Sequence, residues 1–249
     1  MLKLFLASVV LSASLLAGEI SVAVAANLSD VIEVFKTEFA KTNPNIKVNT
    51  VLGASGKFTA QIKNGAPFDL FLSADMGFPE SLYADKIAVT KPVTYASGAL
   101  AMVSTRGLDL SKGMALLEDP KVEKIAIANP KTAPYGAASV EAFKNAKLFE
   151  KVEPKLVQGD SIGQALQFAL TAADVGFVNA SAFYSDKMKA YKKGAQWVDV
   201  DPKLYTPIAQ GVVILKQAEK NAEAKAFYDF VLGAKAKEIF KSYGYLVNE

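Results

Sequence analysis

Apolar residues along the chain recur with two different periods, and these periods alternate from one segment to the next. Residues 20–25 form a short apolar run typical of a buried strand, and the segment after it places its apolar residues on one helical face. That face consists of Leu28, Val31, Ile32, Phe35 and Phe39. Strands are predicted over 20–25, 46–51, 69–73, 99–104, 125–128, 155–158, 175–178 and 211–215. Helices are predicted over 28–42, 57–64, 79–85, 111–117, 135–147, 162–172, 219–232 and 234–243.

This alternation predicts an α/β fold of the doubly wound class, with parallel sheets covered by helices on both faces. Two lobes are expected, because the segments 92–100 and 199–208 are irregular and rich in turn residues, and so suit a two-segment hinge. Lobe I is predicted from 19–95 and 209–249, and lobe II from 96–208. Ligands bind at the carboxyl ends of strands in this class, so a cleft is expected between the lobes.

The first 18 residues have the pattern of a secretory signal peptide. One positive charge, Lys3, precedes an apolar run from Leu4 to Ala17, with cleavage expected near Ala17 or Gly18. The run is shorter than the roughly 20 residues that a membrane-spanning helix needs. We therefore expect a protein that is exported to the periplasm and is not embedded in the membrane.

Composition narrows the function classes. The formal charge of +3 is dispersed and Arg106 is the only arginine, which argues against nucleic acid as a partner. The chain has no cysteine and no histidine, so thiolate chemistry, histidine metal sites and Ser-His-Asp catalysis are excluded. We expect no enzymatic activity, no cofactor and no metal held directly by side chains.

Polar or small turns follow several of the predicted strands and open the next helix. They are Ala26–Leu28, Gly53–Lys57, 129–136, Gly159–Ile162 and Val178–Ser181. Asn27 is predicted to cap the first helix, with Asp30 in its first turn. The Gly53–Lys57 turn is not a phosphate-binding P-loop, because only two residues separate its glycines and a Phe follows its Lys.

Each turn alone is more often a structural cap than a ligand site, but together they would offer N–H groups to one small space. A shell of hydrogen-bond donors without a buried cation suits a small, fully ionised oxyanion, and it disfavours an anion that keeps a proton. Lys57 is expected at the rim, with a role in steering the anion.

Several blocks of residues resemble the periplasmic molybdate-binding proteins of ABC transporters. The match runs in order over essentially the whole mature chain, and its most specific block is Gly-Ala-Pro-Phe-Asp-Leu-Phe-Leu-Ser-Ala-Asp at 65–75. The other blocks are Ala-Ala-Asn-Leu at 25–28, Gly-Ala-Ser-Gly at 53–56, Pro-Tyr-Gly at 134–136, and the tail segments 226–230 and 239–244.

The resemblance implies a type II periplasmic binding protein, here expected as a monomer, that closes on molybdate or tungstate and passes it to a membrane permease. Carried over by position, the oxyanion shell would consist of Asn27, Ser55, the amides of Tyr135 and Ile162, and Asn179. Two positions depart from a common form of the pattern. The first-turn residue is often Ser and is Asn27 here, and the last is often Tyr and is here the shorter Asn179.

Three other functions remain open at this point. A binding protein for sulfate or phosphate would keep the same fold, whereas a two-lobed α/β transferase would rely on Asp69, Asp75 or Asp160. An adhesion or scaffold role would need no ligand. Under the molybdate interpretation, tungstate should bind about as well as molybdate because the two ions are nearly the same size. Sulfate is smaller and should bind far more weakly.

Overall fold

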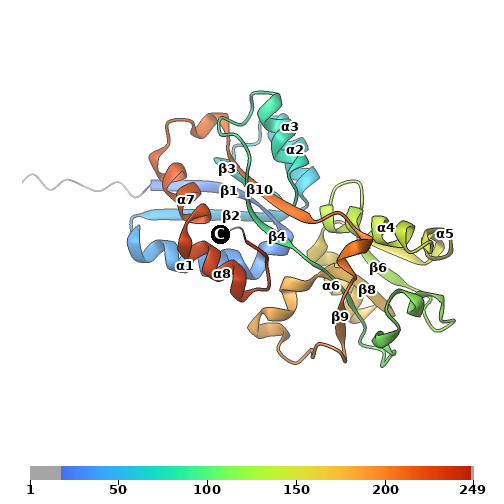
Figure 1. Cartoon of the computed structure of the whole chain (residues 1–249). Helices are drawn as coiled ribbons and strands as arrows, with labels where there is room; N and C mark the ends of the chain where they lie inside the picture. The colour runs from blue at the N-terminus through green and yellow to red at the C-terminus, as the bar shows by residue number, and fades with distance from the viewer. Residues whose placement is uncertain (1–17, 248–249) are drawn as a thin grey trace, which may run out of the picture.

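A computed structural model describes residues 18–247 and shows two lobes, each built on a five-stranded sheet with flanking helices (Figure 1). The two-lobed α/β architecture predicted from the sequence is therefore confirmed. The predicted signal peptide lies outside the described residues, apart from Gly18, which begins the first strand. Within residues 18–247, no helix combines the length and the apolar character needed to cross a membrane.

The first lobe contains the sheet ordered β2-β1-β3-β10-β4. Its strands are β1 (Gly18–Ala25), β2 (Ile46–Gly53), β3 (Leu70–Leu72), β4 (Val93–Gly98) and β10 (Ile208–Ile214). Its helices are α1 (Ser29–Thr42), α2 (Ser55–Lys63), α3 (Gly77–Ala84), α7 (Ala222–Leu232) and α8 (Ala234–Ser242). Helices α1, α7 and α8 pack together through edge-to-face aromatic contacts, among them Phe35 with Phe240 and Phe39 with Phe227.

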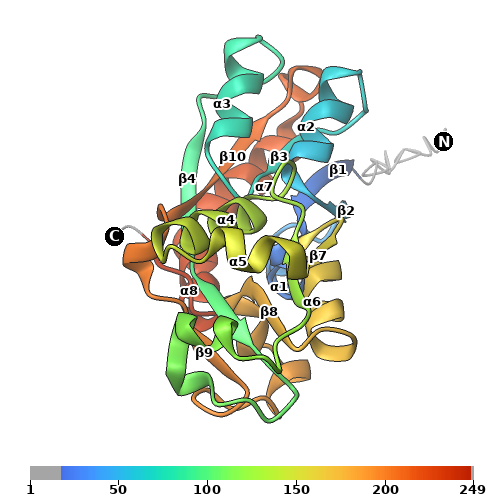
Figure 2. The same cartoon turned by 90° about the vertical axis from the view of Figure 1, so that its right-hand side faces the viewer.

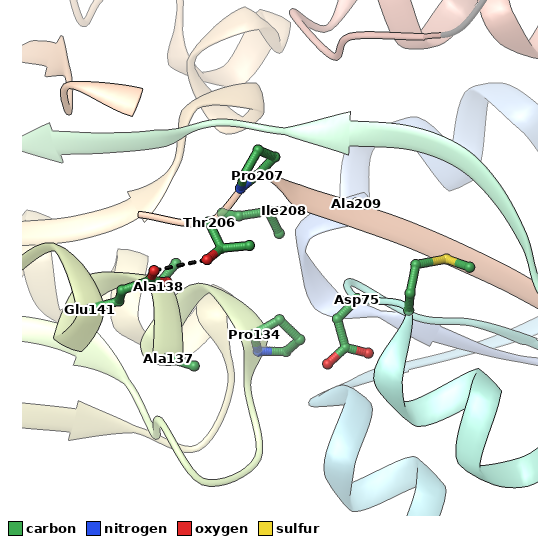
Figure 3. A pocket seen from close by; sticks show the side chains of 10 residues that line it. Asp75, Pro134, Ala137, Ala138, Glu141, Thr206, Pro207, Ile208 and Ala209 are labelled. Atoms are coloured by element: carbon green, nitrogen blue, oxygen red, sulfur yellow. Dashed lines mark hydrogen bonds between the residues drawn. The ribbon is translucent and has the colours of Figure 1, made fainter. Parts of the chain in front are cut away.

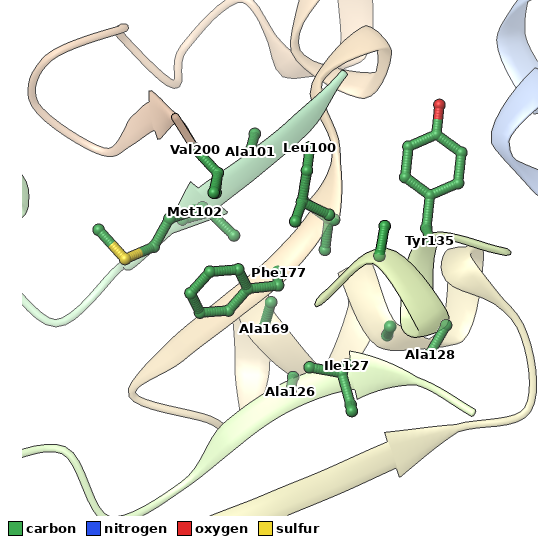
Figure 4. Close-up of a cluster of buried hydrophobic side chains, with 14 of the residues drawn as sticks. Leu100, Ala101, Met102, Ala126, Ile127, Ala128, Tyr135, Ala169, Phe177 and Val200 are labelled. Atoms are coloured by element: carbon green, nitrogen blue, oxygen red, sulfur yellow. The ribbon is translucent and has the colours of Figure 1, made fainter. Parts of the chain in front are cut away.

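The second lobe contains the sheet ordered β7-β6-β8-β5-β9. Its strands are β5 (Leu100–Val103), β6 (Ile125–Ala128), β7 (Leu156–Gly159), β8 (Val175–Asn179) and β9 (Trp197–Asp199). Its helices are α4 (Pro134–Asn145), α5 (Phe149–Val152) and α6 (Ile162–Thr171). Figure 4 shows the buried side chains of this lobe, where Phe177 of β8 lies in the core and Tyr135 of α4 stands at its edge.

The prediction of parallel sheets was wrong in part, because both sheets are mixed. Strand β10 runs antiparallel to β3 and β4, and β5 runs antiparallel to β8 and β9. The physical reason lies in the crossings between lobes. A chain that leaves one sheet along β4 and returns along β10 must run in opposite directions in those two strands.

The two crossings are also more regular than their composition suggested. The segment expected as an irregular crossover is mostly strand, since β4 ends at Gly98 and β5 begins at Leu100. Figures 1 and 2 show β4 leading directly from one lobe to the other. The return passes from β9, which the sequence did not predict, through a short 3-10 turn (Pro202–Leu204) into β10.

Other differences are local. The helix predicted over 111–117 is a 3-10 segment (Leu110–Glu118) that is interrupted at Gly113, where φ is 55°. The helix predicted from 219 begins at Ala222, because the side chain of Asn221 accepts a hydrogen bond from the Ala224 N–H and so caps it. Asn27 does not cap α1. It lies in a 3-10 turn (Ala26–Leu28), and its side chain is buried in a network described below.

Candidate functional site

A small cavity lies between the lobes, at the point where strand ends and helix starts from both lobes meet. The room inside for the centre of a water molecule is about 10 Å³, which is close to what a single water molecule needs, so a larger ligand would have to widen the cavity. Its walls are Ala25, Ala26, Asn27, Gly53, Ala54, Ser55, Ala74, Ala133, Pro134, Tyr135 and Ile162. Four of the five predicted site residues therefore meet at this cavity: Asn27, Ser55, Tyr135 and Ile162.

Three α-helices begin at the cavity wall. Helix α2 starts at Ser55, α4 at Pro134 and α6 at Ile162. The first N–H groups of a helix have no partner within the helix and carry a partial positive charge. Because Pro134 has no N–H, Tyr135 supplies the first amide of α4. These starts give the cavity the electrostatic character of an anion site.

Ser55 is fixed by a bond to the loop that follows β3. It is 1% exposed, and its Oγ accepts a hydrogen bond from the Ala74 N–H at 3.0 Å. With that lone pair engaged, the hydroxyl proton remains available for an anion. The turn Gly159–Ile162 opens a helix as predicted, and its capping residue is Ser161, whose Oγ accepts from the Gln164 N–H at the start of α6.

Asn27 is tied to two residues that are remote in sequence. Its Nδ2 donates to Gln210 Oε1 and to the Tyr245 hydroxyl, both at 2.9 Å. Its Oδ1 is buried and has no hydrogen-bond partner. An unpaired acceptor in a residue that lines an anion cavity needs an explanation, because it would repel the oxygen atoms of the guest.

Asn179 lies behind Asn27 and outside the cavity wall. Its Nδ2 donates to Ser181 Oγ at 2.7 Å and to the carbonyl oxygen of Asn27 at 3.4 Å. The structure therefore brings this residue to the site as a neighbour of Asn27. Direct contact of Asn179 with a ligand stays a prediction.

Contacts across the cleft hold the lobes together around the cavity. The Gly56 N–H of α2 donates to the Thr132 carbonyl oxygen in the loop before α4 at 2.8 Å. Lys57 Nζ lies 3.0 Å from Asp160 Oδ2, and both side chains are largely exposed. Lys57 is thus at the rim as predicted, but it pairs with an acid of the other lobe.

A larger groove of about 390 Å³ adjoins the cavity at Pro134. Figure 3 shows that α4 and the segment entering β10 form two of its sides, with Asp75 across from them. Its polar groups include two carboxylates, of which Glu141 accepts a hydrogen bond from the Thr206 hydroxyl at 2.8 Å. Burial raises the pKa of Asp75, although bonds from the Phe78 N–H and the Ser73 hydroxyl oppose the shift. Acidic groups would repel an anion, so we assign the oxyanion to the small cavity despite the greater volume of the groove.

The acids that a transferase would use have structural partners instead. Asp69 Oδ2 accepts from the Ser21 N–H at 2.7 Å, and Asp75 Oδ1 accepts from the Phe78 N–H at the start of α3. Asp160 pairs with Lys57 across the cleft. Within residues 18–247, no three acidic side chains gather closely enough to hold a metal ion.

Sequence reasoning missed three buried polar residues around Asn27: Tyr95, Gln210 and Tyr245. Gln210 is fully buried, and Gly98 makes room for it, since an added Cβ there would lie 2.6 Å from Gln210 Nε2 and overlap the Tyr135 hydroxyl. Burial raises the pKa of Tyr245 to about 12 and that of Tyr95 well above its usual value, so both hydroxyls are neutral. A glutamine among the apolar and small residues of Ile208–Ile214 was the available signal.

Comparisons with known proteins show which family the chain resembles. Residues 20–246 match the family model described as "Bacterial extracellular solute-binding protein". The chain is 41% identical over 232 residues to "Molybdate-binding protein ModA" of Azotobacter vinelandii, covering 92% of this chain and 90% of that protein. It is 40% identical over 233 residues to the protein of the same name from Rhodobacter capsulatus, covering 92% and 89%. The solved periplasmic molybdate-binding protein of Azotobacter vinelandii superposes with a TM-score of 0.85 at 32% identity, over 92% of this chain and all of that chain (100%).

Proposed function

The chain belongs to the family of bacterial extracellular solute-binding proteins. Because its relatives at 41% and 40% identity are molybdate-binding proteins, we propose that it captures molybdate in the periplasm and delivers it to an ABC transporter. The observation that carries the ligand assignment is the cavity wall. It gathers three helix starts and the Ser55 hydroxyl, and it contains no lysine, arginine, aspartate or glutamate side chain. Fixed dipoles can bind a dianion there without the cost of burying an opposite charge.

We propose that the direct ligand shell consists of Asn27, Ser55 and the backbone amides of Tyr135 and Ile162. The first two residues belong to lobe I and the other two to lobe II, so the anion would join the lobes. A ligand of this kind stabilises the closed form, because the open form lacks half of its contacts. Asn179 would support the shell through its bond to the Asn27 carbonyl oxygen.

Tungstate belongs to the same proposal, because it is nearly the same tetrahedron as molybdate. Sulfate is smaller, so several donors would be stretched or unpaired, at a cost of about 1–3 kcal/mol for each one lost. Phosphate keeps a proton near neutral pH, and a shell made of donors has no acceptor for it. A role in sulfate or phosphate uptake is therefore the alternative that the test must exclude.

The test is calorimetric titration of the ligand-free mature protein with molybdate, tungstate, sulfate and phosphate. We expect similar affinities for molybdate and tungstate and much weaker binding of the other two anions. Equal competition by sulfate would refute the size argument. Binding of none of the four anions would refute the proposed function.

The remaining parts of the proposal concern the setting of the protein. We propose export through the signal peptide at residues 1–18, a monomeric state and no enzymatic activity. We also propose a division of the chain into two lobes, expected at about residues 95 and 208; the separate strand orders of the two sheets support two lobes, although β4 keeps the chain in the first sheet as far as Gly98. Size-exclusion chromatography with light scattering tests the monomer, and N-terminal sequencing of the exported protein tests the cleavage site.

A further inference from the structure

A chain of buried polar groups runs behind the cavity and is centred on Gln210 of β10. Gln210 Oε1 accepts from Asn27 Nδ2 at 2.9 Å and from the Tyr95 hydroxyl at 3.0 Å. Gln210 Nε2 donates to the Tyr135 hydroxyl at 3.1 Å. One residue of the returning hinge strand thus touches a cavity residue of each lobe. Figure 4 shows the Tyr135 hydroxyl pointing away from the core of the second lobe.

The proton count at Tyr95 shows that this arrangement is incomplete. The Tyr95 hydroxyl lies 2.8 Å from the Ser73 carbonyl oxygen and 3.0 Å from Gln210 Oε1. Both of these atoms are acceptors, and a hydroxyl has one proton. One of the two contacts therefore brings two acceptors together.

Rotating the side-chain amides of Gln210 and Asn27 together by about 180° removes the contact between two acceptors at Tyr95. Gln210 Nε2 would then donate to Tyr95 and to Asn27 Oδ1, and Tyr95 would give its proton to the Ser73 carbonyl. Gln210 Oε1 would accept from the Tyr135 hydroxyl. The oxygen and nitrogen of an amide occupy nearly the same space, so the partners decide between the two orientations.

The missing proton is then at the other end of the hydrogen-bond network, at Tyr245. This hydroxyl lies 2.9 Å from the side-chain amide of Asn27 and 3.1 Å from the Asn27 carbonyl oxygen. With the amides turned, both of these neighbours are acceptors for one proton. The network is one proton short, and its two arrangements place the shortage at opposite ends.

The two arrangements differ in what Asn27 offers to a guest. In the first, the atom left over is Oδ1, which is buried without a partner. In the second, Nδ2 takes that place, and the Asn27 carbonyl still has the Asn179 Nδ2 donor at 3.4 Å. An oxyanion with only acceptors gains a hydrogen bond in the second arrangement alone, so its binding shifts the balance toward it.

We propose that Gln210 is a positioning residue that sets the orientation of the Asn27 amide, so that the anion-bound protein presents Asn27 Nδ2 to the ligand. This inference rests on the proposed function and explains the unpaired Oδ1. Gln210 never touches the anion. It acts by giving an N–H to Asn27 Oδ1 when the cavity is filled.

The test compares three variants by calorimetry with molybdate and by thermal unfolding. Gln210→Glu keeps the shape but removes both amide N–H groups, so it holds Asn27 with Oδ1 left over. Its carboxylate also repels the anion, and from the two effects together we expect molybdate to bind about 10- to 100-fold more weakly. Gln210→Met removes the acceptor as well and leaves Asn27 free to turn, so its loss should be less than about tenfold. Gln217→Glu makes the same change at an exposed position and should bind like the wild type.

A structural role alone would make the affinities of these variants follow their stabilities. The inference is overturned if Gln210→Met loses as much affinity as Gln210→Glu, or if Gln210→Glu binds like Gln217→Glu. If wild-type protein does not bind molybdate, the proposed function fails instead.

A measurement on wild-type protein keeps the inference testable if the variants do not fold. In ¹⁵N-labelled protein, saturation with molybdate should shift the side-chain NH₂ signals of both Asn27 and Gln210. The signal of the exposed Asn145, whose Nδ2 donates to the Leu204 carbonyl, should stay in place. A Gln210 signal that does not move at saturation would overturn the proposed exchange.

Discussion

Substitution of Gly56 by alanine should weaken molybdate binding by opposing closure of the lobes. Gly56 is the second residue of α2, and its N–H donates to the Thr132 carbonyl oxygen of the other lobe. A Cβ added at Gly56 would lie 3.0 Å from Thr132 Cα, 3.1 Å from the Thr132 carbonyl oxygen and 2.8 Å from Phe78 Cζ. The Phe78 ring can shift, but the backbone of Thr132 moves away only if the lobes separate.

The expected loss of affinity follows from the free-energy cost of overpacking, which is about 1–3 kcal/mol for an added methyl group in a tight interface. The open form does not contain this contact, so the whole cost should appear in the closing equilibrium and hence in the affinity. That range corresponds to about 5- to 150-fold weaker binding. The stability of the ligand-free protein in urea should change little, because an opened cleft relieves the contact.

Calorimetry measures the affinity of the Gly56→Ala variant, and small-angle scattering with and without molybdate measures its compaction. Gly77→Ala serves as the matched control, because Gly77 is exposed near the start of α3 and has no atom within 4 Å of its added Cβ. Binding by Gly56→Ala within about twofold of wild type would refute the reasoning, since the range above begins near fivefold. An equal loss in Gly77→Ala would show that the cause is not contact with Thr132.

Three further predictions concern the shell, the rim and the response to pH. Ser55→Ala removes the acceptor of the Ala74 N–H, so the free energy of unfolding should fall by about 1–3 kcal/mol in urea titrations and molybdate binding should weaken in calorimetry. An unchanged unfolding midpoint would contradict this. Lys57→Gln breaks an exposed pair with Asp160, so the affinity for molybdate should change less than about fivefold. The difference should shrink in 0.5 M salt, where the Debye length is about three times shorter than at 0.05 M. A larger, salt-independent loss would place Lys57 in the shell. Burial raises the pKa of Tyr245 from near 10 in the unfolded chain to about 12, so the neutral hydroxyl favours the folded protein. This stabilisation is fully present below about pH 10 and is lost as the pH rises through about 12. Tyrosinate absorbance should therefore show this hydroxyl ionising only together with alkaline unfolding, and ionisation near pH 10 in folded protein would contradict the burial.

The ends of strands and the starts of helices could be predicted from the sequence because they depend on neighbouring residues. The turns that contain Ser55, Tyr135 and Ile162 were predicted because each opens a helix after a strand, and the three residues themselves were assigned by resemblance. Two lobes were predicted from two irregular segments, and both of these segments do carry the chain between the sheets. The direction of β10 could not be predicted, because it depends on which sheet the returning strand joins.

Asn27 shows where local reasoning ends. The sequence predicted a helix cap, since an asparagine before an apolar helical pattern is most often one. In the folded chain its partners are Gln210 and Tyr245, which lie 183 and 218 residues away. No local pattern specifies such pairs, because they exist only after β10 and the C-terminal segment have joined the first lobe. The sequence by itself therefore determined which segments could donate N–H groups to an anion. The tertiary structure alone decided how a buried network orients the amide beside them, since hydrogen bonds between distant residues depend on packing that local sequence does not encode.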